Sequence, residues 1–267
     1  MDVAINVKQR KHFVLVHGAC HGAWCWYKLK PLLESAGQRV TAIDLSAAGI
    51  NPKRLDEVYT LEDYSSPLLE LMASIPPAEK VVLVGHSYGG FNLALAMENY
   101  PEKISTAIFV TAFMPDILHP RSYPLEQCLA GQSPEMDSLD REVSTYGTQE
   151  KARKSLLFGP LYLSARLYQL CSVEDLELAK LLVRPTLHLL EDLAKEKPFS
   201  AEKYGSVKRA YIVCKEDKVL TSDFQRSLIE NIEVTEVKEI KDADHMVMLS
   251  KPQELCQNLL DIAEKCT

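Results

Sequence analysis

The sequence has no long hydrophobic run and no apolar leader. Its longest apolar stretches, such as Val81 to Gly85, fall far short of the roughly 20 residues that span a bilayer. Residues Met1 to Lys11 are polar, and the first strand-like segment begins only at His12. We therefore expect no membrane-spanning segment and no export.

An excess of positive charge is also missing. The 30 Lys and Arg residues against 37 Asp and Glu residues give a net charge of −7. Nucleic acids and anionic membranes are bound by concentrated basic surfaces. We therefore expect no nucleic acid and no membrane as a partner, and a small molecule fits better.

Paired cysteines and glycosylation signals are absent too. The seven cysteines are odd in number and lack C-x-x-C spacing, and the chain contains no Asn-x-Ser/Thr triplet. This pattern is typical of reduced thiols in the cytoplasm, which is the location that we expect. With 46% hydrophobic and 25% charged residues, the composition is that of an ordinary globular protein.

Short apolar runs rich in β-branched residues alternate with helical stretches. The runs cover 12–16, 39–43, 81–84, 106–111 and 209–214, with a weaker one at 234–240. The helical stretches include 26–35, 61–74, 89–100, 223–229 and 252–265. Such alternation predicts an α/β protein with a mainly parallel sheet covered by helices on both faces.

The alternation stops near Pro115. The next segment is rich in turn residues up to Tyr146 and is then helical, with a helix over Val173 to Leu182 that Ser172 should cap. We interpret residues 113–186 as a mostly helical cap, inserted into a core made of residues 1–112 and 187–267.

The strongest motif is Gly85-His86-Ser87-Tyr88-Gly89, which follows the strand at 81–84 and precedes a helix. In a nucleophile elbow, a strained turn presents the serine, and small flanking residues let strand and helix approach each other. Because strand, turn and helix occur in this order, we predict that Ser87 is a nucleophile and not part of an ordinary turn.

A serine nucleophile needs a base, and seven histidines are candidates. Six of them occupy positions where a base is not expected: His12 opens a strand, His17 and His21 lie in the loop after it, His86 lies within the elbow, and His119 and His188 lie in or beside the insertion. His245 follows the last strand and precedes the closing helix, as the chain order of α/β-hydrolases requires of the base.

The acid that orients the histidine should follow the strand at 209–214, where Glu216 and Asp217 are adjacent. Spacing alone does not choose between them, and position favours Asp217. Asp244 is also acidic, but it neighbours His245 in sequence and should point elsewhere.

Acyl transfer also needs two donors for the developing oxyanion. The backbone N–H of Tyr88, at the start of a helix, is one candidate. The N–H of Ala19, in the loop after the first strand, is the other, with Gly18 giving the backbone room to turn. A tight turn without a role is the alternative for this loop.

Metal and cofactor signals are weak. His21, Cys20 and Cys25 lack a second ligand pair at recognisable spacing, and residues 85–90 lack both the dinucleotide and the P-loop spacing. We predict no metal and no bound cofactor.

Five segments carry a specific likeness: HFVLVHGACHGAWCW at 12–26, VTAIDLSAAG at 40–49, KVVLVGHSYGG at 80–90, SVKRAYIVCKEDK at 206–218 and DHMVML at 244–249. Over nearly its whole length, the chain resembles the plant methylesterase and hydroxynitrile lyase family of α/β-hydrolases. The resemblance implies the α/β-hydrolase fold and a triad of Ser87, Asp217 and His245. It also implies an oxyanion site at Ala19 and Tyr88, and it selects Asp217 over Glu216.

The same resemblance bears on the reaction. Lyases of this family typically place threonine directly after the first-loop histidine and lysine directly after the catalytic histidine, where this chain has Gly18 and Met246. A lysine would stabilise departing cyanide, and a threonine would crowd the water and acyl group of hydrolysis. The resemblance therefore implies a serine esterase with Gly18 and Met246 beside the substrate.

The resemblance implies that substrate choice is set by the cap, which here starts at about Phe113. Members acting on small aromatic methyl esters tend to carry bulky aromatics in the cap, and this chain has Cys128, Ser138 and Val143 at such positions. We expect these residues and Phe113 to line a pocket for a bulkier methyl ester, such as an indole alkaloid intermediate. If that ester lies β to an aldehyde, the released acid can lose carbon dioxide.

Three alternatives remain open. They are a methylesterase acting on a hormone ester of the salicylate, jasmonate or indole acetate type, a hydroxynitrile lyase using the same triad, and a non-catalytic ligand receptor. The sequence also leaves the oligomeric state open, a homodimer included.

Overall fold

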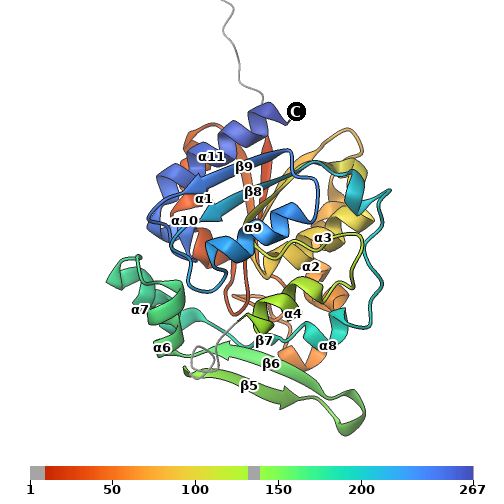
Figure 1. Ribbon diagram of the computed structural model, residues 1–267, viewed down its shortest axis with the longest axis vertical. Coiled ribbons are helices and arrows are strands. Elements are labelled where there is room, and N and C mark those ends of the chain that lie inside the picture. The colour runs from red at the N-terminus through yellow and green to blue at the C-terminus, as the bar shows by residue number, and fades with distance from the viewer. Residues whose placement is uncertain (1–9, 132–138, 267) are drawn as a thin grey trace, which may run out of the picture.

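The computed structural model describes residues 10–131 and 139–266, and a six-stranded sheet forms its centre (Figure 1). The strands are β1 (His12–Val16), β2 (Arg39–Ile43), β3 (Val81–Ser87), β4 (Ile104–Ala112), β8 (Arg209–Cys214) and β9 (Glu236–Ile240). Their order is β2-β1-β3-β4-β8-β9, and every neighbouring pair is parallel. The predicted α/β architecture is confirmed.

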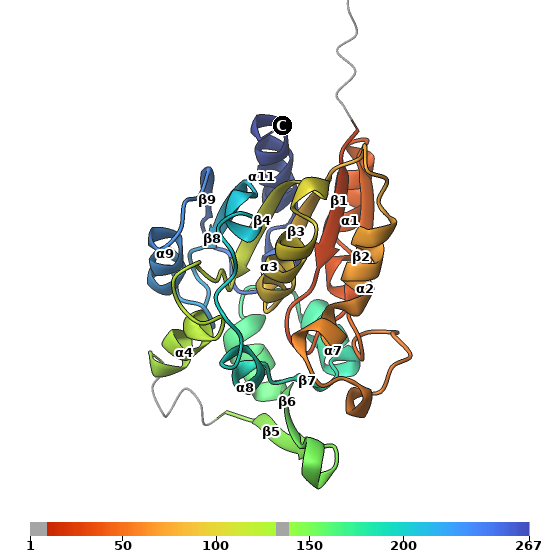
Figure 2. The same ribbon diagram turned by 90° about the vertical axis from the view of Figure 1, so that its right-hand side faces the viewer.

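Helices cover both faces of this sheet. On one face α1 (Leu29–Ser35) packs against α11 (Pro252–Lys265), and on the other α2 (Leu61–Ser74) packs against α3 (Gly89–Asn99), as Figures 1 and 2 show. The shorter helices α9 (Ser222–Glu230) and α10 (Val247–Ser250) follow β8 and β9. Because β1 and β3 are covered on both sides, each residue of these strands is buried, which explains their continuous apolar runs.

A second group of elements lies beyond the carboxyl ends of the strands, between β4 and β8 in the chain (Figure 2). It contains α4 (Tyr123–Ala130), β5 (Arg141–Tyr146), β6 (Arg153–Phe158), α6 (Pro160–Tyr162), α7 (Val173–Leu182), β7 (Thr186–Leu187) and α8 (Leu190–Leu193). The predicted helix at α7 is confirmed to the residue, and the Ser172 side chain caps it by accepting from the Asp175 N–H.

This inserted group also contains a small sheet that was not expected. Strands β5, β6 and β7 form an antiparallel sheet, in a region where only turns and helices were predicted. Most of β5 is exposed, so it lacks the apolar alternation that identifies a half-buried strand. Its turn into β6 contains Gly147 at a φ of +90°, a left-handed conformation that favours glycine.

Candidate active site

Four loops meet at the carboxyl edge of the parallel sheet. The loop after β1 carries Ala19, β3 ends at Ser87, and the loops after β8 and β9 carry Asp217 and His245. The strand order reverses at β1, since β2 and β3 lie on opposite sides of it. Ligands of open α/β sheets bind at the carboxyl ends beside such a reversal.

Ser87 occupies the strained turn that the elbow motif predicted. Its φ is +53°, a left-handed conformation that is costly for a residue with a side chain. A Cβ on Gly85 would lie 2.7 Å from the Leu93 side chain, and one on Gly89 would lie 2.8 Å from the carbonyl oxygens of Val16 and His17. Because backbone oxygens cannot move aside, Gly89 is needed for the loop and the helix to approach each other, while Gly85 spares the Leu93 side chain a shift.

Asp217 and His245 are joined by a buried hydrogen bond of 2.6 Å between the carboxylate Oδ2 and the ring Nδ1. The other carboxylate oxygen, Oδ1, accepts the backbone N–H groups of Val219 and Leu220. Glu216, in contrast, is exposed. The Nδ1–H of His245 thus donates to Asp217, which leaves the lone pair on Nε2 free to accept a proton.

Asp244 points elsewhere, as its position beside His245 predicted. Its carboxylate accepts the N–H of Leu170 at 2.8 Å and the hydroxyl of Ser250 at 2.7 Å. Burial raises the pKa of this carboxyl. Asp244 therefore binds the loop that carries His245 to a segment of the inserted group and does not orient the imidazole.

Thr111, at the end of β4, is a site residue that was not predicted. Its hydroxyl donates to Asp217 Oδ2 at 2.5 Å, on the same oxygen that receives His245. Thr111 adopts a φ of +36°, which is strained for a β-branched residue. A threonine that ends a buried strand looks like an ordinary strand residue, so no local signal could have identified it.

The loop after β1, which is predicted to supply an oxyanion donor and is called the oxyanion loop below, is held by His17. Leu45 N–H donates to His17 Nε2 at 3.1 Å, so the proton of the neutral ring lies on Nδ1 and is donated to the Gly18 carbonyl at 2.8 Å. Gly18 C=O and Ala19 N–H belong to one planar peptide, so this bond also fixes the Ala19 N–H. The N–H groups of Ala19 and Tyr88 have no acceptor within the described ranges.

The buried histidines near the site are held neutral. Burial lowers the pKa of His21 to about 3. Burial, followed by the nearby His245, lowers the pKa of His86 well below its usual range. Burial likewise lowers the pKa of His17. These rings therefore act as fixed hydrogen-bonding groups near neutral pH.

The residues expected to line the substrate pocket lie in different environments. A Cβ on Gly18 would lie 2.8 Å from the Ser87 Cβ, so Gly18 directly adjoins Ser87. Met246 is buried directly after His245, and Phe113 is buried with its ring against Tyr88 and Phe91.

The three cap positions differ from one another as well. Cys128 is buried on α4, whereas Val143 on β5 remains 50% exposed. Ser138 lies outside the described residues.

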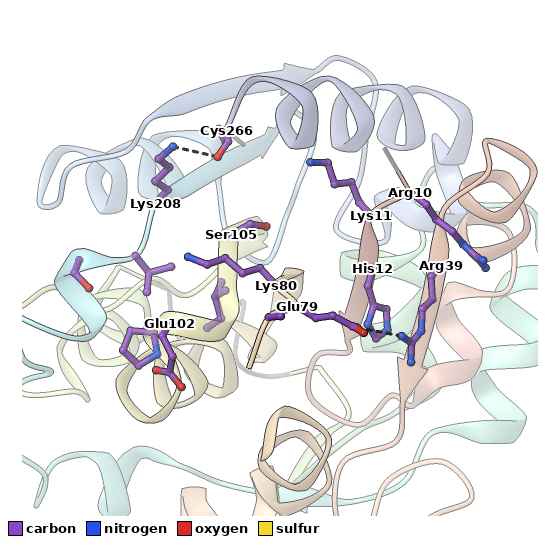
Figure 3. Close-up of a pocket in the computed structure, with 15 residues that line it drawn as sticks. Arg10, Lys11, His12, Arg39, Glu79, Lys80, Glu102, Ser105, Lys208 and Cys266 are labelled. Atoms are coloured by element: carbon purple, nitrogen blue, oxygen red, sulfur yellow. Dashed lines mark hydrogen bonds and ion pairs between the residues drawn. The ribbon is translucent and has the colours of Figure 1, made fainter. Parts of the chain in front are cut away.

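A wide cavity lies at the opposite edge of the sheet, where β1, β3 and β4 begin (Figure 3). Arg10, Lys11, Lys80 and Lys208 line it, together with the ion pair between Arg39 and Glu79. It is separate from the loops around Ser87. Within residues 10–131 and 139–266, no cluster of side chains is arranged as a metal site, and no helix is long and apolar enough to cross a membrane.

Comparisons with known proteins found a matching family model and relatives that cover nearly the whole chain. A family model described as "Alpha/beta hydrolase family" matches residues 13–258. Norfluorocurarine synthase 1 of Strychnos nux-vomica is 61% identical over 98% of both chains. Polyneuridine aldehyde esterase of Rauvolfia serpentina is 60% identical over 99% of this chain and 100% of that one.

A crystal structure of polyneuridine aldehyde esterase superposes on this chain with a TM-score of 0.93. It is 60% identical, and the match covers 96% of this chain and 100% of the other. The resemblance inferred from the five sequence segments is confirmed.

Proposed function

The chain belongs to the alpha/beta hydrolase family, and we propose that it hydrolyses the methyl ester of a small plant metabolite with Ser87, His245 and Asp217 as its triad. The observation that carries this proposal is the 2.6 Å bond between His245 Nδ1 and Asp217. It leaves His245 Nε2 as a proton acceptor at the sheet edge where the strained elbow presents Ser87.

In this mechanism, Ser87 Oγ attacks the ester carbonyl carbon while His245 Nε2 takes the hydroxyl proton. The carbonyl electron pair moves to oxygen, and the N–H groups of Ala19 and Tyr88 stabilise the oxyanion. When the carbonyl re-forms, the methoxy group leaves as methanol with the proton from His245. Water then attacks the acyl group on Ser87, with His245 again as base, and the free acid is released.

We further propose an indole alkaloid intermediate as the substrate. Two relatives at 60% and 61% identity carry names that refer to such metabolites, polyneuridine aldehyde esterase and norfluorocurarine synthase 1. Cys128, buried on α4, has a small side chain at a position where family members acting on small aromatic esters tend to carry a ring, and we propose that a bulkier ester occupies the difference in volume. If the ester is β to an aldehyde, the acid formed loses carbon dioxide without further help from a protein group.

The hydroxynitrile lyase alternative is disfavoured by two positions. A Cβ at position 18 would lie 2.8 Å from the Ser87 Cβ, so the threonine of lyases would press on the nucleophile unless the loop moved. Met246 is fully buried and uncharged at the position where a lyase would place lysine. No cation thus adjoins His245 in sequence to stabilise cyanide.

A panel of methyl esters tests the proposal. Phenolic, oxylipin, indole acid and alkaloid methyl esters are supplied in turn, and methanol and free acid are quantified to obtain kcat/KM for each. The proposal expects the highest kcat/KM with an alkaloid ester. A preference for a phenolic or oxylipin ester would assign a hormone-type methylesterase, cyanide release from a cyanohydrin would assign a lyase, and binding without turnover would assign a receptor.

We also propose that residues 113–186 act as a substrate-selecting cap on a core of 1–112 and 187–267, and that the protein works in the cytoplasm.

We propose a homodimer as the oligomeric state. It would cover the exposed apolar side chains of α7, among them Val173 at 72% and Leu181 at 80% exposure. Sedimentation of wild type and of Leu181→Glu tests this point, since only the wild type should associate.

A further inference from the structure

A short turn of the inserted group contacts three of the loops around the site. Residues 168–171 follow a π-helical turn, Leu163–Leu167, and precede α7. The N–H of Tyr168 donates to the Leu163 carbonyl at 2.9 Å, and the N–H of Cys171 donates to the Tyr168 carbonyl at 3.1 Å. These bonds give the segment, called the cap turn below, a defined shape of its own.

The first contact of the cap turn reaches the oxyanion loop. The Tyr168 hydroxyl lies 2.7 Å from His21 Nε2, and the two rings stack with centroids 5.9 Å apart. On the other side of the ring, His21 Nδ1 lies 2.8 Å from the Ala19 carbonyl oxygen.

The direction of these two bonds follows from the charge of the ring. Because burial lowers the pKa of His21 to about 3, the ring is neutral and has one donor and one acceptor nitrogen. A carbonyl can only accept, so Nδ1–H donates to Ala19 and Nε2 accepts from Tyr168. Tyr168 therefore fixes the ring that holds the Ala19 carbonyl.

The next two contacts reach the loops of the acid and the base. The Gln169 side chain donates from Nε2 to the Glu216 carbonyl at 2.8 Å, on the peptide that joins Glu216 to Asp217. The Leu170 N–H donates to Asp244 Oδ2 at 2.8 Å, directly before His245. Three consecutive residues of the cap turn thus hold Ala19 and the immediate neighbours of the acid and the base.

We infer that the cap turn positions the catalytic loops relative to one another, with Tyr168 as the positioning residue for the oxyanion site. The inference rests on the proposed function for its meaning in catalysis. The inference adds that a segment of the inserted group aligns the loops that carry the proposed catalytic residues. Displacing the cap turn would disturb the oxyanion, acid and base loops together.

Tyr168→Phe tests the inference, because it keeps the stacked ring and removes only the hydroxyl. Tyr146→Phe is the matched control, since the Tyr146 hydroxyl also reaches from the inserted group to the core, at 2.7 Å from the Val58 carbonyl, outside the loops described above. We expect Tyr168→Phe to lower kcat about fivefold with KM nearly unchanged. A trifluoromethyl ketone, which places an oxyanion in the site, should bind about fivefold more weakly. Tyr146→Phe should change neither.

Hydrogen exchange supplies a readout that does not depend on turnover. Amides of residues 17–26 should exchange faster in Tyr168→Phe than in wild type and in Tyr146→Phe. If Tyr168→Phe fails to fold, Gln169→Leu replaces it, because the Gln169 side chain is partly exposed. This variant removes the hydrogen bond to the Glu216 carbonyl, and its kcat tests whether the cap turn positions the loop of Asp217.

The outcomes distinguish a failure of the inference from a failure of the proposed function. If Tyr168→Phe matches Tyr146→Phe in kcat, inhibitor binding and exchange, the inference is overturned while esterase activity stands. If Ser87→Ala hydrolyses esters as well as wild type, the proposed function fails, and the exchange experiment still decides whether the cap turn holds the oxyanion loop.

Discussion

His86 donates a hydrogen bond from Nε2 to the carbonyl oxygen of His245, at 2.7 Å, and the two ring centroids lie 4.6 Å apart. The residue before Ser87 therefore holds the backbone of the loop that presents His245. A base was not expected at His86 because of its place in the elbow, and this bond shows that its ring holds a specific structural partner.

We predict that His86→Phe, which keeps a ring but loses the donor, lowers kcat about tenfold or more. The unpaired His245 carbonyl should also reduce the free energy of unfolding by about 1–3 kcal/mol. Steady-state kinetics and urea unfolding measure the two effects. A destabilised variant with kcat within twofold of wild type would show that the bond serves stability alone.

Asp217→Asn should depress turnover strongly, by up to about ten-thousandfold as in other triads, because the imidazole loses its orienting anion. Glu216→Gln is the matched control, since Glu216 is the adjacent acid and its side chain is exposed. The kcat of Glu216→Gln should stay within about twofold of the wild-type value. A larger loss in Glu216→Gln than in Asp217→Asn would reverse the assignment of the acid.

Cys128→Phe should shift substrate preference. A ring at this buried position on α4 would fill space in the proposed pocket. A large ester would then bury fewer methylene groups, and its binding free energy would weaken by about 0.8 kcal/mol for each one left exposed. The ratio of kcat/KM for an alkaloid methyl ester to that for methyl salicylate should therefore fall. A ratio equal to that of wild type would place Cys128 outside the pocket.

Acid should destabilise the protein in part through His12. Burial, followed by the charge of Arg39, lowers its pKa to about 4, while an unfolded histidine has a pKa of about 6.5. The unfolded state therefore binds an extra proton between these values. The stability present above pH 6.5 is lost as the pH falls toward 4, by at most about 1.4 kcal/mol per pH unit.

The variant His12→Gln isolates this effect, since its amide can still bond Thr41, the partner of the His12 ring, but cannot take up the proton. Urea unfolding at several pH values between 4 and 6.5 gives the free energy of unfolding as a function of pH. Its slope should be smaller in the variant, by the amount that corresponds to about one fewer proton taken up on unfolding. Equal slopes in the two proteins would exclude His12 from the acid response.

Local patterns predicted the elements of the core well. The runs at 12–16 and 209–214 have the same bounds as β1 and β8, because strands covered on both faces must be continuously apolar. The expected helix at 26–35 begins only at Leu29, since a 3₁₀ turn, Ala23–Trp26, precedes it. Element ends depend on such packing details, which the sequence does not display.

Contacts between distant segments could not be predicted. The bond from Thr111 to Asp217 joins residues 106 positions apart, and that from Tyr168 to His21 joins residues 147 apart. Neither pair has a motif, because each bond depends on how two loops fold toward each other. The β5–β6 hairpin was missed for the opposite reason, since its exposed strand needs no apolar pattern at all.

The central claim is that Ser87 is the nucleophile of ester hydrolysis, and the turnover of one methyl ester by Ser87→Ala tests it most directly. Removing a triad member in other hydrolases lowers kcat by up to about a millionfold. We predict a loss of at least about ten-thousandfold in kcat for purified Ser87→Ala. Its circular dichroism spectrum should match that of wild type, which shows that the variant is folded. A folded Ser87→Ala protein that retains most of the wild-type turnover would contradict the account.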